Sequence, residues 1–108
     1  MNKHNQIEQL FRQSRPLFVA LGDPVRQELL LNMMNGEVLS VKELAAKTNL
    51  SRPTISHHLR ILKDAQIITE HKQGRQTFYR PQPGKYFYTV KKLLQTIDIK
   101  IKSESETQ

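Results

Sequence analysis

Cysteine and tryptophan are both absent from this chain of 108 residues. Without cysteine there can be no disulfide, no thiol nucleophile and no thiolate ligand for a metal ion. The sequence also lacks a run of about 18 apolar residues and a segment resembling a secretory signal peptide. We therefore expect a soluble, cytoplasmic protein without membrane insertion, built as one domain or as one domain with short appendages.

Residue patterns that carry catalysis are missing as well. The chain has four glycines in all and no glycine-rich phosphate loop. It has neither an HExxH pair nor an ordered set of nucleophile, base and acid. We expect no enzymatic activity and no cofactor.

Positive charge is what the chain has in excess. The formal net charge is +7 and the pI is ≈ 9.9, and residues 1–102 carry 17 basic against 8 acidic side chains. This balance favours a polyanionic partner. Charge alone is weak evidence, because it also fits binding to a membrane surface or mere solubility.

Two amphipathic helices are predicted in the first third of the chain. The apolar spacing over residues 4–21 is helical, with an interruption expected at Pro16, which lacks an amide donor. Asp23 and Pro24 are suited to begin a second helix, and Gly36 is placed to close it. Arg26 could pair with an acid or contact nucleic acid, and we favour the structural role.

A helix-turn-helix is predicted next. Ser40 and Glu43 form a Ser-x-x-Glu capping box at the start of a short third helix, which should end near residues 48–49. Ser51 then caps a fourth helix, with Pro53 in its first turn. Two helices joined by about four turn residues, the second with a polar face, are typical of a helix-turn-helix.

The fourth helix has one apolar and one polar face. Ile55, Leu59 and Leu62 share the apolar face. The polar and basic side chains outside it suit a groove in nucleic acid, although a helix taken by itself would more often have an ordinary solvated face. The candidate DNA-binding residues of this helix are Ser51, Arg52, Thr54, Ser56, His57 and Arg60.

The four histidines do not suggest a metal site. His57 and His58 are adjacent on the fourth helix, so they point about 100° apart and cannot share an ion as an i, i+4 pair does. His71 lies on a predicted strand and His4 near a terminus. We expect His58 to be a packing residue whose ring donates to a backbone acceptor, and we expect no metal.

A β-hairpin and a final helix complete the predicted elements. Residues 67–69 and 77–79 favour strands, with Gly74 at the tip and Pro81 near the end. The candidate nucleic-acid contacts on the hairpin are Lys72, Gln73 and Arg75, although the same residues would suit a plain soluble turn. The last helix should span about 85–101, unless its alternating end forms a strand, and we expect residues 103–108 to form a disordered tail.

Four segments of this sequence resemble the ArsR family of winged-helix transcriptional repressors. They are ALGDPVRQELL, GEVLSVKELA, LSRPTISHHLRILKDAQII and GRQTFYR, and together they cover roughly residues 18–80. The resemblance implies a mostly α, homodimeric winged helix-turn-helix of order α-α-α-α-β-β-α in residues 1–102. It also implies that the fourth helix reads the major groove, that the hairpin is the wing, and that the terminal helices form the dimer interface.

The resemblance does not extend to the metal sites of the family. Metal sensors of the arsenic or cadmium type carry Cys-Val-Cys early in the third helix, where this chain has Ser40, Val41 and Lys42. The zinc, nickel or cobalt type has carboxylate and histidine ligands on the last helix, where this chain has no histidine and Asp98 stands alone. The resemblance therefore implies DNA binding without either common metal site.

We thus expect a homodimeric repressor that binds double-stranded DNA at an inverted-repeat operator. It would be released by a small molecule or a protein, or only regulate its own gene. The alternatives are a winged-helix module that binds a protein without specific DNA binding, and a non-specific architectural DNA-binding protein. The expected dimer interface consists of Leu10, Phe11, Tyr86, Val90, Leu93, Leu94 and Ile97.

Overall fold

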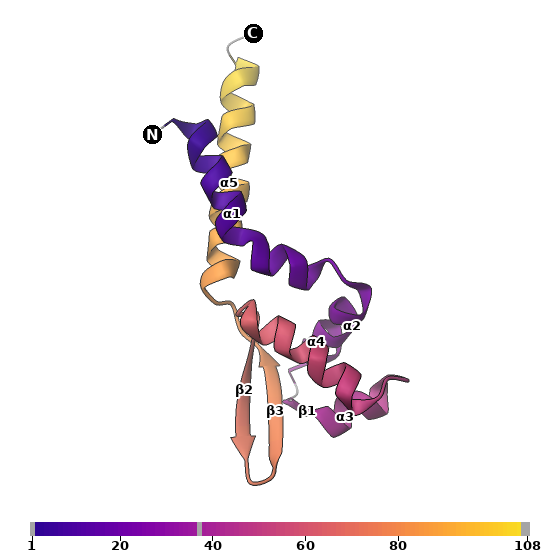
Figure 1. The fold of residues 1–108 in the computed structure, drawn as a ribbon. Helices are drawn as coiled ribbons and strands as arrows, with labels where there is room; N and C mark the ends of the chain where they lie inside the picture. The colour runs from indigo at the N-terminus through magenta and orange to yellow at the C-terminus, as the bar shows by residue number, and fades with distance from the viewer. Residues whose placement is uncertain (1, 37, 107–108) are drawn as a thin grey trace.

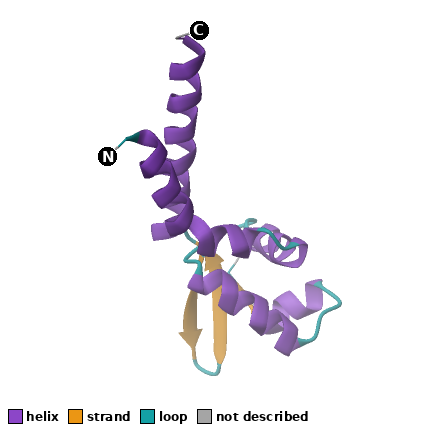
Figure 2. Ribbon diagram, turned by 45° about the horizontal axis from the view of Figure 1, so that its top comes forward, coloured by secondary structure: helices purple, strands orange, loops and turns teal. Residues whose placement is uncertain are grey.

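The computed structural model describes residues 2–36 and 38–106 and contains five helices and a small antiparallel sheet in that part of the chain (Figures 1 and 2). The elements follow one another as α1 (Lys3–Leu21), α2 (Pro24–Met33), β1 (Leu39–Ser40), α3 (Val41–Lys47), α4 (Arg52–Asp64), β2 (Ile68–Gln73), β3 (Gln76–Pro81) and α5 (Lys85–Glu106). The predicted mostly α fold with a hairpin is confirmed.

The helix starts follow the capping residues that the sequence predicts. The Asp23 carboxylate accepts from the amides of Val25 and Arg26, at 2.8 and 3.2 Å. At α3 the capping box is complete, with Ser40 and Glu43 exchanging two 3.1 Å side chain–backbone bonds. These bonds satisfy amides that a helix start leaves free.

The sheet has three strands in the order β1-β3-β2 rather than the two that the sequence predicts. The additional strand is β1, whose Leu39 and Ser40 pair with Tyr79 and Phe78. Two residues are too few to show the alternation of apolar and polar side chains that identifies a strand, so the sequence does not predict β1. Gly74, with φ +64°, opens the two-residue turn between β2 and β3, as predicted.

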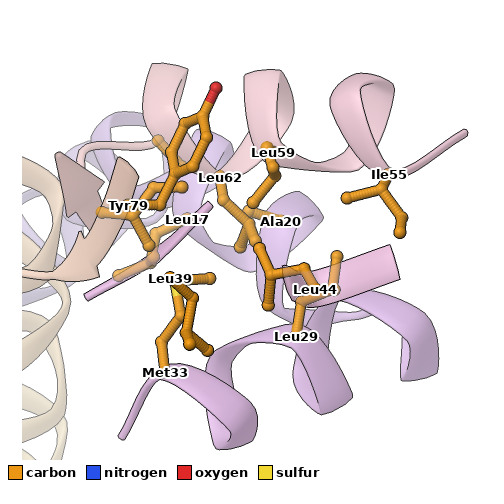
Figure 3. Packing of buried hydrophobic residues seen from close by; sticks show 12 residues of the cluster. Leu17, Ala20, Leu29, Met33, Leu39, Leu44, Ile55, Leu59, Leu62 and Tyr79 are labelled. Atoms are coloured by element: carbon orange, nitrogen blue, oxygen red, sulfur yellow. The ribbon is translucent and has the colours of Figure 1, made fainter. Parts of the chain in front are cut away.

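The core lies between α1, α2, α3, α4 and the sheet. Figure 3 shows Leu29 and Met33 of α2 facing Leu59 and Leu62 of α4, with Leu44 between them. These five side chains are at most 1% exposed. The apolar face predicted for α4 is therefore buried, and the helix has one face left for solvent or a ligand.

The terminal helices form an arm that projects from this core. We call residues 3–15 and 85–106 the arm, and residues 16–84 the head. Figure 1 shows α1 lying along α5 in its first half and then bending across the head. Pro16 lies inside α1 and removes one amide from the helix ladder, which accounts for a bend without the predicted break.

The end of α5 differs from the prediction. Residues 103–106, expected to belong to a disordered tail, continue the helix, while residues 107–108 lie outside the described part of the chain. Two i, i+4 ion pairs support these last turns, Lys100–Glu104 at 2.7 Å and Asp98–Lys102 at 3.0 Å. The hydrogen bond and charge of Lys100 also lower the pKa of Glu104.

Candidate nucleic-acid interface

The outer face of α4 gathers the candidate reading residues. Its cap, Ser51, accepts from the amide of Thr54 at 3.4 Å, and its hydroxyl lies 2.9 Å from the Thr54 hydroxyl. The Arg60 guanidinium lies 3.5 Å from Nδ1 of His57. All six side chains are exposed on one helix: Ser51, Arg52, Thr54, Ser56, His57 and Arg60.

The hairpin of β2 and β3 forms a projecting wing. Figures 1 and 2 show it extending from the head in the direction opposite to the arm. Lys72, Gln73 and Arg75 are exposed at or beside its turn, as the sequence predicts. Residues 51–80 contain six lysines and arginines against two acidic residues, so α4 and the wing together present positive charge.

An ion pair joins α4 to the wing, and sequence reasoning missed it. Lys63 near the end of α4 donates to the Glu70 carboxylate of β2 at 3.2 Å. Glu70 pairs across the sheet with Tyr79 of β3. Burial, together with the negative charge of Glu70, raises the pKa of the Tyr79 hydroxyl, while Lys63 opposes the shift. The contact links the wing to the helix beside it.

Arg26 has the structural role that the sequence favours. The side chain is 10% exposed, and it donates to the carbonyls of Ala20 at 2.8 Å and Val19 at 3.0 Å. It also donates to Nδ1 of His58 at 3.2 Å, since a guanidinium has no acceptor. The sequence predicts that the His58 ring donates to a backbone acceptor. That prediction is wrong for Nδ1, because this nitrogen accepts from Arg26 instead. Arg26 thus ties the end of α1 to α4.

The C-terminal end of α4 is closed by a Schellman motif at Gln66. Gln66 has φ +58°, and its amide donates to Lys63 while the Ile67 amide reaches back to Leu62. The Gln66 side chain accepts from the amide of Lys85 at 3.1 Å, at the start of α5. Gln66 therefore joins the end of α4 to the beginning of the arm.

The predicted dimer residues divide into two groups. Leu10 and Leu93 are 6% and 0% exposed because α1 and α5 bury them within one chain. Phe11 and Leu94 are 49% and 58% exposed. The half-buried residues are Tyr86, Val90 and Ile97. Leu10 and Leu93 have no surface left to offer a second copy, whereas Phe11 and Leu94 do.

The predicted dimer residues leave out exposed apolar residues of the terminal helices that lie seven positions from Phe11 or Leu94. Phe87 and Ile101 lie seven residues before and after Leu94 and are 37% and 61% exposed. Phe18 lies seven residues after Phe11, is 41% exposed, and its ring centroid is 6.2 Å from that of Phe11. The spacing of seven was the sequence signal that would have identified them.

Other kinds of site find no support in the described residues. Among residues 2–36 and 38–106, no group of three histidine, aspartate or glutamate side chains could hold a metal ion. Within the same residues, no helix is long and apolar enough to cross a membrane.

Known proteins similar to this chain are transcriptional regulators. Residues 23–70 match the family described as "Bacterial regulatory protein, arsR family". The chain is 38% identical over 63 residues to the transcriptional repressor SdpR of Bacillus subtilis, covering 58% of this chain and 69% of that protein. It is 36% identical over 64 residues to the repressor SmtB of Mycobacterium tuberculosis, covering 59% of this chain and 47% of that protein.

Solved structures extend the similarity to the terminal helices. An ArsR-like regulator from Rhodococcus sp. RHA1 covers 91% of this chain and 94% of its own, with a TM-score of 0.71 and 25% identity. The repressor BigR of Xylella fastidiosa covers 88% of this chain and 95% of its own, with a TM-score of 0.63 and 26% identity. The winged helix-turn-helix prediction is confirmed, and the chain belongs to the arsR family of bacterial regulatory proteins, as a DNA-binding transcriptional regulator and not an enzyme.

Proposed function

We propose that this protein is a homodimeric repressor that reads an inverted-repeat DNA operator with α4 and the wing. The observation that carries the proposal is that α4 buries the apolar face formed by Ile55, Leu59 and Leu62 and exposes all of its candidate polar and basic side chains. An exposed helix of this kind fits the major groove of DNA, where arginine can pair with guanine and small polar side chains can bind phosphates.

The wing supplies phosphate contacts in this proposal. Lys72 and Arg75 lie at the exposed end of the hairpin, and the Lys63–Glu70 ion pair stabilises its position beside α4. Cations of this kind strengthen binding to any duplex and position the reading helix without selecting a sequence.

The dimer forms through the arm. The radius of gyration of the chain is 17.3 Å, against about 13 Å for a compact domain of this length. Phe87, Leu94 and Ile101 form an exposed stripe with heptad spacing on α5. Two copies of α5 packed antiparallel about a two-fold axis would place Leu94 against the partner's Leu94 and Phe87 against the partner's Ile101.

Cross-linking tests this register directly, because the chain has no cysteine of its own. Leu94→Cys should form a disulfide-linked dimer under mild oxidation, and Phe87→Cys mixed with Ile101→Cys should form a mixed dimer. Ile99→Cys is the matched control, since Ile99 is 53% exposed on a different face of α5. Efficient cross-linking of the control with none at Leu94→Cys would contradict the register.

Selection of bound duplexes from a random DNA pool tests the function. We expect an imperfect inverted repeat with half-sites about 10 bp apart or a multiple of that distance. His57→Ala and Arg60→Ala should change or relax the selected sequence, whereas Lys91→Ala, an exposed cation on α5, should not. Equal binding of all duplexes would contradict sequence-specific repression.

The release signal should be something other than a thiolate-bound metal. Ser40, Val41 and Lys42 stand where the metal-sensing relatives carry Cys-Val-Cys, and a protonated lysine has no lone pair to donate. A non-metal effector, or autoregulation without one, is consistent with these residues.

A further inference from the structure

An apolar groove lies where the head meets the arm. It has a volume of about 650 Å³, within the range of about 300–1,000 Å³ that is typical of small-molecule sites. Its lining includes Leu30 and Leu31 of α2 and Met34, which follows that helix. It also includes Ile67, Pro83 and Phe87, from the segments before and after the β2–β3 hairpin.

The walls of this groove carry no charge. Its two polar lining residues are Gln27 and Gln82, and Gln27 already donates to the Leu21 carbonyl at 2.6 Å. A quarter of the chain is charged, so the absence of lysine, arginine, aspartate and glutamate from this lining is selective. An ion bound here would lose hydration without gaining a partner, whereas an uncharged apolar molecule would lose little.

A second copy of the chain covers only one end of the groove. In the antiparallel register proposed above, the partner's Ile101 lies against Phe87, and the partner segment that follows Ile101 reaches the start of α5. That segment reads Lys102, Ser103 and Glu104, and all three side chains are exposed and polar or charged. It offers no apolar group for the surface formed by Leu31 and Met34.

The position of the groove connects it to DNA binding. Ile67 follows the Schellman end of the reading helix, and its carbonyl accepts from the amide of Gln82, just after the wing. Phe87 lies in the first turn of α5 and begins the exposed stripe of the arm. An occupant of the groove therefore contacts the segments that join the reading helix and the wing to the dimer helix.

We propose that this groove binds an uncharged, largely apolar small molecule, and that binding lowers operator affinity by changing the angle between head and arm. The proposal that a small molecule binds here depends only on the volume and lining of the groove. The effect on DNA rests on the proposed function.

A binding experiment tests the site with the uncharged fluorophore N-phenyl-1-naphthylamine. We expect saturable fluorescence enhancement with one site per chain, and a loss of affinity of at least tenfold in Met34→Lys and Leu31→Lys. These side chains are 66% and 69% exposed, so their replacement should not prevent folding. Val38→Lys is the matched control, because Val38 is 46% exposed and apolar but does not line the groove.

An operator titration tests the regulatory step. Saturating fluorophore should weaken binding of the selected operator by about fivefold or more in the unaltered protein, and not in Met34→Lys. An unchanged operator affinity would overturn the regulatory step. If the proposed function is wrong, the protein will bind all duplexes equally well in the absence of the fluorophore, which is a different result from an unchanged operator affinity.

Two further outcomes would overturn the site itself. One is a fluorophore affinity that Met34→Lys and Leu31→Lys leave unchanged. The other is a dimer that dissociates in these two variants during sedimentation while Val38→Lys stays dimeric. In that case the second copy, and not a small molecule, covers the groove.

Discussion

The head and the arm bury apolar side chains in different ways. The head encloses a cluster of twelve buried residues between its helices and sheet, including Leu29, Leu44 and Leu62 at 0% exposure. Of the described arm side chains, Leu10 and Leu93 are the buried apolar ones, while Phe11, Leu94 and Ile101 remain about half exposed or more. The head encloses its apolar core within one chain, whereas the arm leaves apolar surface that a second copy covers in the proposed dimer.

This difference separates what each part must do. A rigid head holds the α4 side chains at fixed distances from one another, which a reading surface requires. In the proposed dimer the arm would fix the distance between two such heads, because a dimer reads half-sites whose spacing follows the DNA helix. The free energy of unfolding should therefore depend mainly on the head, and dimerisation on the arm.

The largest expected effect is on the stability of the head. Leu62→Ala should lower the free energy of unfolding by about 3 kcal/mol, because it leaves a cavity in a closely packed core. Urea unfolding of a dilute sample measures this change. Ile99→Ala, at a residue 53% exposed on the arm, should change it by less than about 0.5 kcal/mol. Equal losses in both variants would remove the distinction between head and arm.

A smaller effect is expected on the dimer. Leu94→Lys would place two ammonium groups against each other at the two-fold axis, and should weaken dimerisation about a hundredfold, or roughly 2.7 kcal/mol. Sedimentation measures the dimer, and circular dichroism should show an unchanged head. Ile99→Lys, on another face of α5, should remain dimeric. A dimeric Leu94→Lys would place the interface elsewhere.

The junction between head and arm should respond to one methyl group. A Cβ at residue 84 would lie 2.5 Å from the Gln66 carbonyl oxygen and 2.7 Å from its Cβ. Gly84→Ala should therefore cost about 1–2 kcal/mol of unfolding free energy, as overpacking does. Nothing lies within 4 Å of a Cβ at Gly36, and asparagine tolerates its positive φ, so Gly36→Asn should cost less. The reverse ranking would contradict the close approach at Gly84.

The wing should contribute affinity without selectivity. Arg75→Ala should weaken binding to all duplexes alike and reduce the salt dependence by roughly 1 unit of slope, because one phosphate contact is lost. Fluorescence anisotropy across a salt series measures the slope. Lys91→Ala, which removes an equal charge from the arm, should leave it unchanged. A loss confined to one operator base would instead make Arg75 a reading residue.

The smallest expected effect is a pH dependence at the cap of α2. Burial alone would raise the pKa of Asp23, but the amides of Arg26 and Val25 and the charge of Arg26 bring it below its usual value. A lowered folded-state pKa adds stability above the unfolded pKa of about 3.9, and this stability is lost as the pH falls through the folded value. Asp23→Asn keeps an acceptor and cannot titrate, so its stability should fall less between about pH 5 and pH 2. Parallel curves for both proteins would contradict this assignment.

Local patterns predicted the helices and most of the candidate interface. Asp23, Ser40 and Ser51 start helices where the sequence places them, because a cap depends on three or four adjacent residues. The exposed face of α4 follows from helical periodicity alone. The direction of the Arg26 side chain does not follow from periodicity, because its partners are backbone carbonyls of α1 and the ring of His58 on α4.

Periodicity also failed to separate the two apolar faces of α5. Leu93 and Leu94 are adjacent and equally apolar, yet the first packs against α1 and the second faces outward. A helix with a wide apolar surface can bury either side, and only the placement of α1 decides which side remains. For this reason the predicted dimer interface names both Leu93, which is buried within one chain, and Leu94, which is exposed.

The sequence by itself determined the positions of its caps, the buried face of α4, the turn of the wing and the absence of a cysteine metal site. Each of these depends on residue chemistry or on contacts within one or two helical turns. Only the tertiary structure decided the third strand, the link through Arg26, the bend of α1 and the stripe left open along α5. These depend on contacts between residues far apart in the chain, where packing in three dimensions chooses among partners that the sequence leaves equivalent.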